Sequence, residues 1–324
     1  MSRSNPFFTA VFMLALLTLT IVSCGSDDQQ SSAEPQEEVR PTKVVIKIPE
    51  IVMSEYTTRA AMQVYSLRAV AEVYRKGAAD PLVHQAVILT PTAVSNVYFF
   101  EIEGLEASDY DIYVWTDYST DGGDLFYLTD NLRAIRFNDP EYKPQDSNLR
   151  RAYYGKTSVN IARGTQTHTE PVKARTPFAR YRIEAMDIDK YEQMKAANGW
   201  PELEDLDVRV TYNSYVPTSF DILVGQPSDA EKGIRYTTKA MRTTEGKVVI
   251  SDDFVFVTGT KSSVNVTIQM VNPVNEEVIS SIDNLEVEYQ EGHVTTVSGD
   301  FLTSSSLDGS IIDTRWDGEY NIEF

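Results

Sequence analysis

Oxygen-bearing side chains gather in one short stretch of the chain, residues 117–124, with the sequence DYSTDGGD. Asp117, Ser119 and Asp121 stand at the first, third and fifth positions of an EF-hand calcium loop, and a glycine follows at the sixth. Position twelve is a leucine instead of the bidentate glutamate, and no flanking helices are predicted. The stretch therefore predicts either a low-affinity Ca²⁺ site, with Asp117, Asp121 and Asp124 as candidate ligands, or a solvated hairpin loop whose Asp and Gly residues favour turns.

Residues that catalyse hydrolysis or group transfer do not form a recognisable set. His84, His168 and His293 stand far apart, without a nucleophile elbow or an HExxH motif. Since the chain has 48 acidic residues, two neighbouring carboxylates would be expected without any catalytic role. No glycine-rich phosphate loop occurs either. The sequence predicts a protein that is not an enzyme, with no catalytic residues and no cofactor.

The single cysteine, Cys24, directly follows an apolar segment that runs from Phe7 to Val22. Because this segment has 16 residues and a membrane-spanning helix needs ~20, a secretory signal is the better interpretation. Ile21, Val22 and Ser23 before the cysteine resemble the bacterial lipobox, which predicts a signal peptide over residues 1–23 and acylation at Cys24. The alternative is an ordinary signal peptide followed by an incidental cysteine.

Lipidation of Cys24 would leave no thiol for a disulfide, a zinc site or redox chemistry. Two or more acyl chains hold a protein stably to a membrane, whereas one holds it only marginally at ~0.8 kcal/mol per buried CH₂. The formal charge of −19 would become −20 once Arg3 leaves with the signal peptide. Such an acidic protein repels nucleic acid and anionic lipid, so its attachment to a membrane is expected through the lipid.

Beyond a polar, acidic tether at residues 24–41, the sequence alternates apolar and polar residues in many short runs. Period-two alternation predicts half-buried antiparallel strands and hence an all-β protein. About 300 mature residues suit two sandwiches of ~100 residues or more better than one. The clearest runs are KVVIKI (43–48), DYDIYV (109–114), DVRVTY (207–212), SVNVTIQM (263–270) and LEVEY (285–289).

Helical spacing is confined to two short pieces. Residues 187–199 predict a helix that ends at Gly199, and the segment TDNLRAIRF predicts a single helical turn around Leu132. A break in composition between Pro171 and Pro177 separates two strand-rich halves. We therefore expect one domain over 42–174 and a second over 175–324, with the helix in the second.

Several segments, in order along nearly the whole mature chain, resemble fimbrillin-type surface lipoproteins, which build or anchor type V pili. They are YDIYVWTDY (110–118), RRAYYG (150–155), TPFARYRIEAMDI (176–188), YVPTSFDILVGQP (215–227), DDFVFVTG (252–259), GHVTTVSGDFLT (292–303) and WDGEYNIEF (316–324). The resemblance implies two transthyretin-like β-sandwiches in series. The acidic SDD after Cys24 is similar to the signal that directs such lipoproteins to the outer leaflet of the outer membrane.

The resemblance also implies partners: other pilus subunits, joined when an extended segment of one fills a groove in the next. In polymerising subunits a trypsin-like protease first removes the N-terminal strand after an arginine, whereas anchor subunits keep it. Here Arg40 precedes Pro41, which hinders such cleavage, and the next arginine is Arg59. The sequence favours retention, and with it a pilus anchor or accessory subunit that takes part in adhesion.

The aromatic residues suggest a second function, a monomeric surface lipoprotein that binds a host ligand or glycan. Aromatic rings near loops can stack on the apolar faces of sugars. The opposing interpretation is that these rings fill strands and sandwich corners. The residues concerned are Trp115, Tyr118, Tyr127, Tyr153, Tyr154, Trp200 and Trp316.

Overall fold

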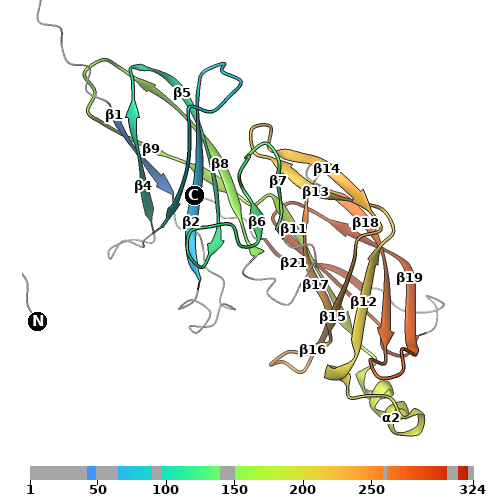
Figure 1. Cartoon of the computed structure of the whole chain (residues 1–324). Helices are drawn as coiled ribbons and strands as arrows, with labels where there is room; N and C mark the ends of the chain where they lie inside the picture. Colours follow the sequence, from blue (N-terminus) through green and yellow to red (C-terminus); the bar gives the residue numbers. More distant parts are fainter. Residues whose placement is uncertain are drawn as a thin grey trace, which may run out of the picture. The chain divides into compact units, whose positions relative to one another are not determined.

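The computed structural model describes residues 42–48, 65–89, 97–138, 150–257, 261–304 and 313–319 (Figure 1). Side chains are described throughout these ranges except for Thr42, Ile48 and 313–319. The predicted signal peptide and tether lie outside the described residues, and so do Cys24, Arg40 and Arg59.

The described fold is all-β, with one α-helix, as the alternation predicted. One three-stranded sheet has the order β4 (Tyr98–Leu105), β1 (Thr42–Ile48), β9 (Thr167–Pro171). A five-stranded sheet has the order β10 (Lys173–Arg175), β8 (Tyr153–Ile161), β5 (Ser108–Ser119), β2 (Ser66–Arg75), β3 (Val83–Ile88). These two sheets face each other across a core whose members run from Val44 to Ala174.

The later part of the chain forms a second pair of sheets. One has the order β16 (Met241–Arg242), β17 (Val248–Phe256), β11 (Phe178–Ala185), β20 (His293–Gly299), β21 (Asp313–Glu319). The other has the order β15 (Arg235–Lys239), β12 (Asp207–Tyr212), β18 (Ser262–Val271), β19 (Val278–Tyr289). Their shared core runs from Ala179 to Leu302.

A fifth sheet contains strands from both parts of the chain. Its order is β14 (Gln226–Lys232), β13 (Tyr215–Asp221), β7 (Ile135–Phe137), β6 (Tyr127–Leu128). Pairing of β7 with β13 places Ile135 opposite Phe220. A third core cluster joins Trp115 and Tyr127 to Phe220 and Phe256 and so includes residues from both sides of position 174.

The predicted alternation is confirmed residue by residue in β18. Val264, Val266, Ile268 and Met270 are fully buried, while the polar residues between them are only partly buried. Such a pattern is expected where one face of a sheet lies on a core and the other meets water. Strand β12 begins and ends where the sequence predicted.

The helix α2 (Ile188–Asn198) is followed by a short 3₁₀ turn at Leu203–Asp205. Gly199 ends α2 in a left-handed conformation, with φ 68° and ψ 29°, and its N–H donates to the carbonyl oxygen of Lys195. Glycine adopts this conformation without the Cβ clash that other residues meet. The predicted helix and its end are therefore confirmed.

Two local expectations were wrong. Leu132 lies in a turn closed by the Ala134 N–H on the Asn131 carbonyl oxygen, and strand β7 begins directly afterwards, so no helical turn forms. The loop after β5 is not a hairpin, because β5 pairs with β2 and β8 whereas β6 pairs with β7 in another sheet. Arg68 contacts this loop from a strand about fifty positions earlier in the sequence, so that contact leaves no local pattern.

The two sandwiches repeat one topology. Strand β1 lies between antiparallel β4 and parallel β9, and strand β11 lies between antiparallel β17 and parallel β20. The opposite sheets also correspond strand by strand. The order β3-β2-β5-β8 in the first sandwich matches the order β15-β12-β18-β19 in the second. These two parallel pairs, β1 with β9 and β11 with β20, are exceptions to the expected antiparallel arrangement, because in each sandwich the first strand pairs in the same direction with the second-to-last one.

Candidate functional site

The first strand of the described chain, β1, occupies the centre of its sheet. Its antiparallel pairing to β4 sets Ile46 opposite Phe100, and its parallel pairing to β9 sets Ile46 opposite Glu170. Lys43 N–H donates to the Gln166 carbonyl oxygen at 3.1 Å. The strand thus forms backbone hydrogen bonds on both of its sides.

Two side chains of β1 enter the core between the sheets. Val44 and Ile46 are both completely buried, among residues that include Phe100, Ile102 and Val172. Burying one such side chain stabilises a fold by ~1.5–3 kcal/mol. On the exposed face of the strand, Lys43 forms an ion pair with Glu101 at 2.5 Å. Strand β1 is therefore an integral part of the first sandwich.

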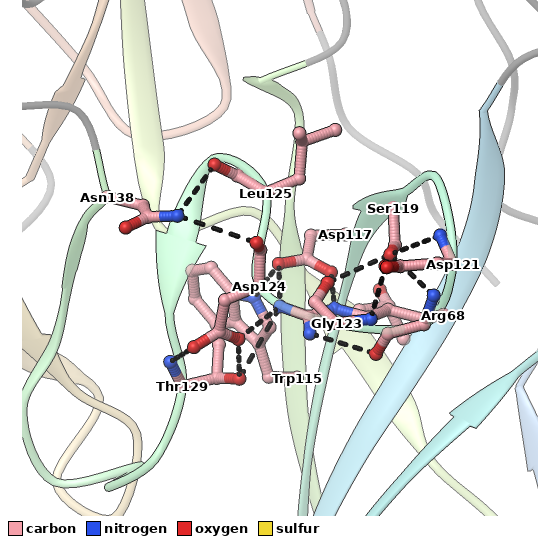
Figure 2. Close-up of polar contacts among 12 residues, drawn as sticks. Arg68, Trp115, Asp117, Ser119, Asp121, Gly123, Asp124, Leu125, Thr129 and Asn138 are labelled. Carbon is pink, nitrogen blue, oxygen red and sulfur yellow. Dashed lines mark hydrogen bonds and ion pairs between the residues drawn. The ribbon is translucent and has the colours of Figure 1, made fainter.

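Two of the three predicted calcium ligands, Asp117 and Asp124, lie around a guanidinium group (Figure 2). Arg68 on β2 binds Asp117 on β5 through two contacts, Nε to Oδ1 at 2.6 Å and Nη2 to Oδ2 at 3.0 Å. Its Nη2 also lies 2.9 Å from Oδ1 of Asp124. The Trp115 indole N–H donates to Asp117 Oδ2 at 3.1 Å. Arg68 thus supplies the positive charge that a bound Ca²⁺ would have supplied to these carboxylates.

The third predicted ligand, Asp121, has a different role. Its Oδ1 accepts the Gly123 N–H at 2.9 Å. Ser119 Oγ accepts the N–H of Gly122 at 2.8 Å and donates to the Gly123 carbonyl oxygen at 2.8 Å. These are the local bonds by which Asp and Ser side chains shape turns, so this part of the turn interpretation agrees with the structure. Asp121 is therefore not brought into the set formed by Asp117 and Asp124.

Burial and the neighbouring groups shift the pKa values of the two carboxyls in what we call the Arg68 cluster: Arg68, Asp117, Asp124 and Thr129. Desolvation raises the pKa of the Asp117 carboxyl, and the Arg68 guanidinium opposes that rise. Burial would also raise the pKa of Asp124, but the hydrogen bonds from Thr129 and the nearby Arg68 outweigh it, so this pKa is lowered. The N–H and Oγ of Thr129 donate to Asp124 at 3.1 and 2.6 Å.

The Arg68 cluster lies where the chain passes from β5 in one sheet to β6 in another. Arg68 is 1 % exposed and Asp117 fully buried, so neither is accessible to a ligand. The loop from Ser119 to Tyr127 passes over them, and Nη1 of Arg68 donates to the Gly122 carbonyl oxygen within it, at 3.2 Å. Among the described residues no group of three or more His, Cys, Asp or Glu side chains is placed to hold a metal ion.

Sequence reasoning missed Arg68, although a signal was present. In the run SLRAVAEVYR, Arg68 and Glu72 are charged residues on one face of the strand, and the other residues from Leu67 to Tyr74 are apolar. Both are buried. Since a buried charge needs a partner, such a pair within an apolar run predicts buried ion pairs or hydrogen bonds to other strands. The partner itself cannot be read from the run.

The three histidines remain in separate places. Nδ1 of His84 lies 3.0 Å from Oε1 of Glu72, Nε2 of His168 lies 2.6 Å from Oε1 of Glu170, and Nδ1 of His293 lies 2.8 Å from the Glu291 carbonyl oxygen. The structure brings no two of them together.

The aromatic platform proposed for sugar binding does not form from the predicted residues. Trp200 stacks on Tyr191 with ring centroids 5.5 Å apart. The side chain of Trp316 lies outside the described residues. The five remaining residues are buried: Trp115, Tyr118, Tyr127, Tyr153 and Tyr154. These five side chains therefore pack in two of the core clusters.

Fold and site together define a two-sandwich, all-β protein in which an N-terminal strand completes the first sandwich. The chain belongs to a family of unknown function, DUF6562, whose sequence pattern matches residues 36–324. No curated protein matches the chain. Within the described part of the chain, no helix has both the length and the apolar composition needed to cross a membrane.

Solved structures with a similar arrangement differ widely in sequence. A candidate polysaccharide-binding protein from Bacteroides thetaiotaomicron is 12 % identical, with a TM-score of 0.48, over 86 % of this chain and 99 % of that one. The fimbrial anchor protein Mfa2 from Porphyromonas gingivalis is 10 % identical, with a TM-score of 0.45, over 86 % and 98 %. A candidate cell adhesion protein from Bacteroides uniformis is 9 % identical, with a TM-score of 0.47, over 89 % and 100 %.

Proposed function

We propose that this chain is a non-enzymatic lipoprotein of the cell surface, attached to the outer membrane through acylated Cys24, and that it serves as an anchor or accessory subunit of a pilus. Its domains are 42–174 and 175–324, after a signal peptide over 1–23 and a tether over 24–41. Other pilus subunits would bind it by strand exchange, and adhesion would follow from the assembled fibre.

The observation that carries the proposal is the position of β1. The strand lies between β4 and β9, and Val44 and Ile46 fill the core beneath it. Cleavage after Arg59 would separate this strand from the rest of the chain and expose the edges of both neighbours. An extended segment of another subunit fits such a gap, because backbone hydrogen bonds give affinity and alternate side chains give specificity. A chain that keeps β1 keeps its gap filled, as expected for an anchor.

The N-terminal residue and intact mass of the surface-exposed mature protein test this proposal. A start at Cys24 with added acyl mass supports the anchor, and substituting Cys24→Ser should release the protein from the membrane fraction. A start at Ala60 would instead identify a processed, polymerising subunit and contradict retention. An Arg59→Ala variant is the matched control, because it removes the predicted cleavage point without touching the lipidation site.

The glycan-binding alternative has its own test. A strictly monomeric chain that is retarded by polysaccharide in affinity electrophoresis, and is absent from high-mass pilus ladders, would replace the pilus function by glycan binding.

A further inference from the structure

The strands at the ends of the described sheets differ in their protection against pairing. Exposed sheet edges invite other strands, and natural proteins block them with charges, prolines or short lengths. Strand β9 ends in a proline, β14 contains a proline and three charges, and β4, β10, β15, β16, β19 and β21 carry charged residues. Strand β6 has only two residues. Strand β3, with the sequence VHQAVI, has none of these features.

The backbone groups of β3 point in two opposite directions. The Leu89 N–H donates to the Leu67 carbonyl oxygen at 2.8 Å, so residues 89, 87, 85 and 83 direct their backbone groups toward β2. By the same period of two, the N–H and C=O groups of His84, Ala86 and Ile88 face away from β2. No described strand pairs with β3 on that side.

Apolar side chains accompany this free edge. Val83 and Val87 are only partly buried where they pack on the first core. Leu82 is 51 % exposed and Ile88 42 % exposed. A further strand along β3 would cover part of this surface and pair with the backbone groups that no described strand meets.

We propose that the occupant of this edge is β3 of a second copy of the chain, paired antiparallel about a two-fold axis through Ala86. The three outward residues are centred on Ala86, so Ala86 meets its own counterpart and His84 meets Ile88 of the partner subunit. In a two-fold pair the same patch meets itself, so an acidic or basic strand would meet its own charge. Strand β3 contains no Asp, Glu, Lys or Arg, and it is the only end strand longer than two residues among the described sheets with that property.

The dependence of association on salt distinguishes self-pairing from the binding of a basic segment of another protein. Two copies with a net charge of −19 repel each other at long range, and salt screens that repulsion. Self-pairing therefore strengthens from about 0.01 M to about 1 M NaCl, as the Debye length falls from ~30 Å to ~3 Å. A basic extended segment attracted by the acidic chain would be released over the same range.

Cysteine pairs test the register. Opposed residues in a hydrogen-bonded antiparallel pair have Cα atoms ~5.5 Å apart, which lies within the range for a disulfide. Under mild oxidation with diamide, Ala86→Cys should form a disulfide dimer. His84→Cys and Ile88→Cys should each remain uncrosslinked alone and form a dimer when mixed. The unsubstituted chain, oxidised in parallel, measures the background of crosslinking.

Sedimentation of the full chain in detergent across the NaCl range tests the association itself. We expect a monomer–dimer equilibrium that shifts toward dimer with salt. Ala86→Pro removes the central N–H and Ala86→Lys places like charges on the axis, so both should be monomeric. Thr237→Lys, on the exposed face of β15, is the matched control and should still dimerise.

Three results would overturn the proposal. The first is that the wild-type chain is monomeric at every salt concentration. The second is that both Ala86 variants still form dimers. The third is that the chain binds a basic extended peptide along β3 at low salt but does not associate with itself. Circular dichroism identifies a variant that has lost its fold, and Ala86→Lys then decides the matter if Ala86→Pro is the one that unfolds.

Discussion

At the scale of single residues, buried arginine–aspartate pairs link neighbouring strands of both sandwiches. Arg68 binds Asp117 between β2 and β5, and Arg180 binds Asp252 between β11 and β17, with Nε and Nη2 contacts of 2.6 and 2.5 Å. Paired guanidinium and carboxylate groups match in geometry, so each pair is held by two hydrogen bonds. A buried pair of this kind adds little net stability but is costly to break.

Substituting Arg68→Met should therefore destabilise the protein by about 3–5 kcal/mol, because it leaves the buried Asp117 carboxylate without its charge partner. The double variant Arg68→Met with Asp117→Leu removes both charges of this pair and should recover part of that loss, since Asp124 still lacks Arg68 and the Trp115 indole N–H still lacks its acceptor. Urea unfolding of the two variants measures the difference. Equal losses in the single and double variants would contradict a coupled pair.

The phenol of Tyr74 should make stability depend on pH in the alkaline range. Burial raises its pKa to about 12, and its hydrogen bond to Glu72, at 2.6 Å between Oη and Oε2, acts in the same direction. Since the unfolded phenol ionises near pH ~10, this contribution is fully present below that pH and is lost as the pH rises through about 12.

Unfolding free energies of the wild type and Tyr74→Phe, measured from about pH 8 to about pH 12, isolate this effect. The difference between the two proteins should shrink as the pH rises. Tyr215→Phe is the control, because Tyr215 is 70 % exposed. A difference that stays constant over this range would contradict the assignment to Tyr74.

At the scale of elements, the place of β1 in the first sandwich makes a direct prediction. Ile46→Ala should cost about 2–5 kcal/mol, because it leaves a cavity in the core between two sheets. Lys47→Ala, on the exposed face of the same strand, should change stability by less than ~0.5 kcal/mol. Chemical denaturation of the full chain gives both values. Equal and small effects would mean that β1 is not packed in the folded protein.

Alternation was sufficient to predict the strands that have one wet face. Strands β12 and β18 were found to within one residue, because every second side chain is apolar and the core lies on one side only. Strand β2 escaped notice because both of its faces are covered, so SLRAVAEVYR shows no clear period. The parallel neighbours of β1 and β11 were also missed, since pairing partners far apart in sequence leave no local pattern.

The candidate site, like the fold, could be predicted from the sequence only where its contacts are local. The turn-forming role of Asp121 was predicted from the sequence, because its hydrogen bond with the Gly123 N–H is local. Arg68 reaches Asp117 across 49 positions of sequence, so its contact with the predicted ligands was not. An acidic cluster in a sequence therefore defines a metal site only once the nearby cations are known.

At the scale of the whole molecule, the third core cluster joins the two sandwiches. Phe220 stacks on Phe256 with centroids 5.6 Å apart and meets Tyr154 at 4.8 Å. It also lies on β13, which pairs with β7 from the earlier part of the chain. A residue with such contacts couples the stability of one sandwich to that of the other.

Wild-type protein should therefore open both sandwiches in one cooperative step, and Phe220→Ala should separate the step into two. Besides an overall loss of about 3–5 kcal/mol, segments of β2 and β5 should then exchange amide hydrogens with a free energy different from that of β12 and β18. Phe301→Ala is the matched control, because Phe301 is equally buried but belongs to the second core alone. It should destabilise without splitting the transition. Segment-resolved hydrogen exchange, followed by mass spectrometry, measures the wild type and both variants. A wild-type protein that already unfolds in two steps would show that the third cluster does not couple the sandwiches.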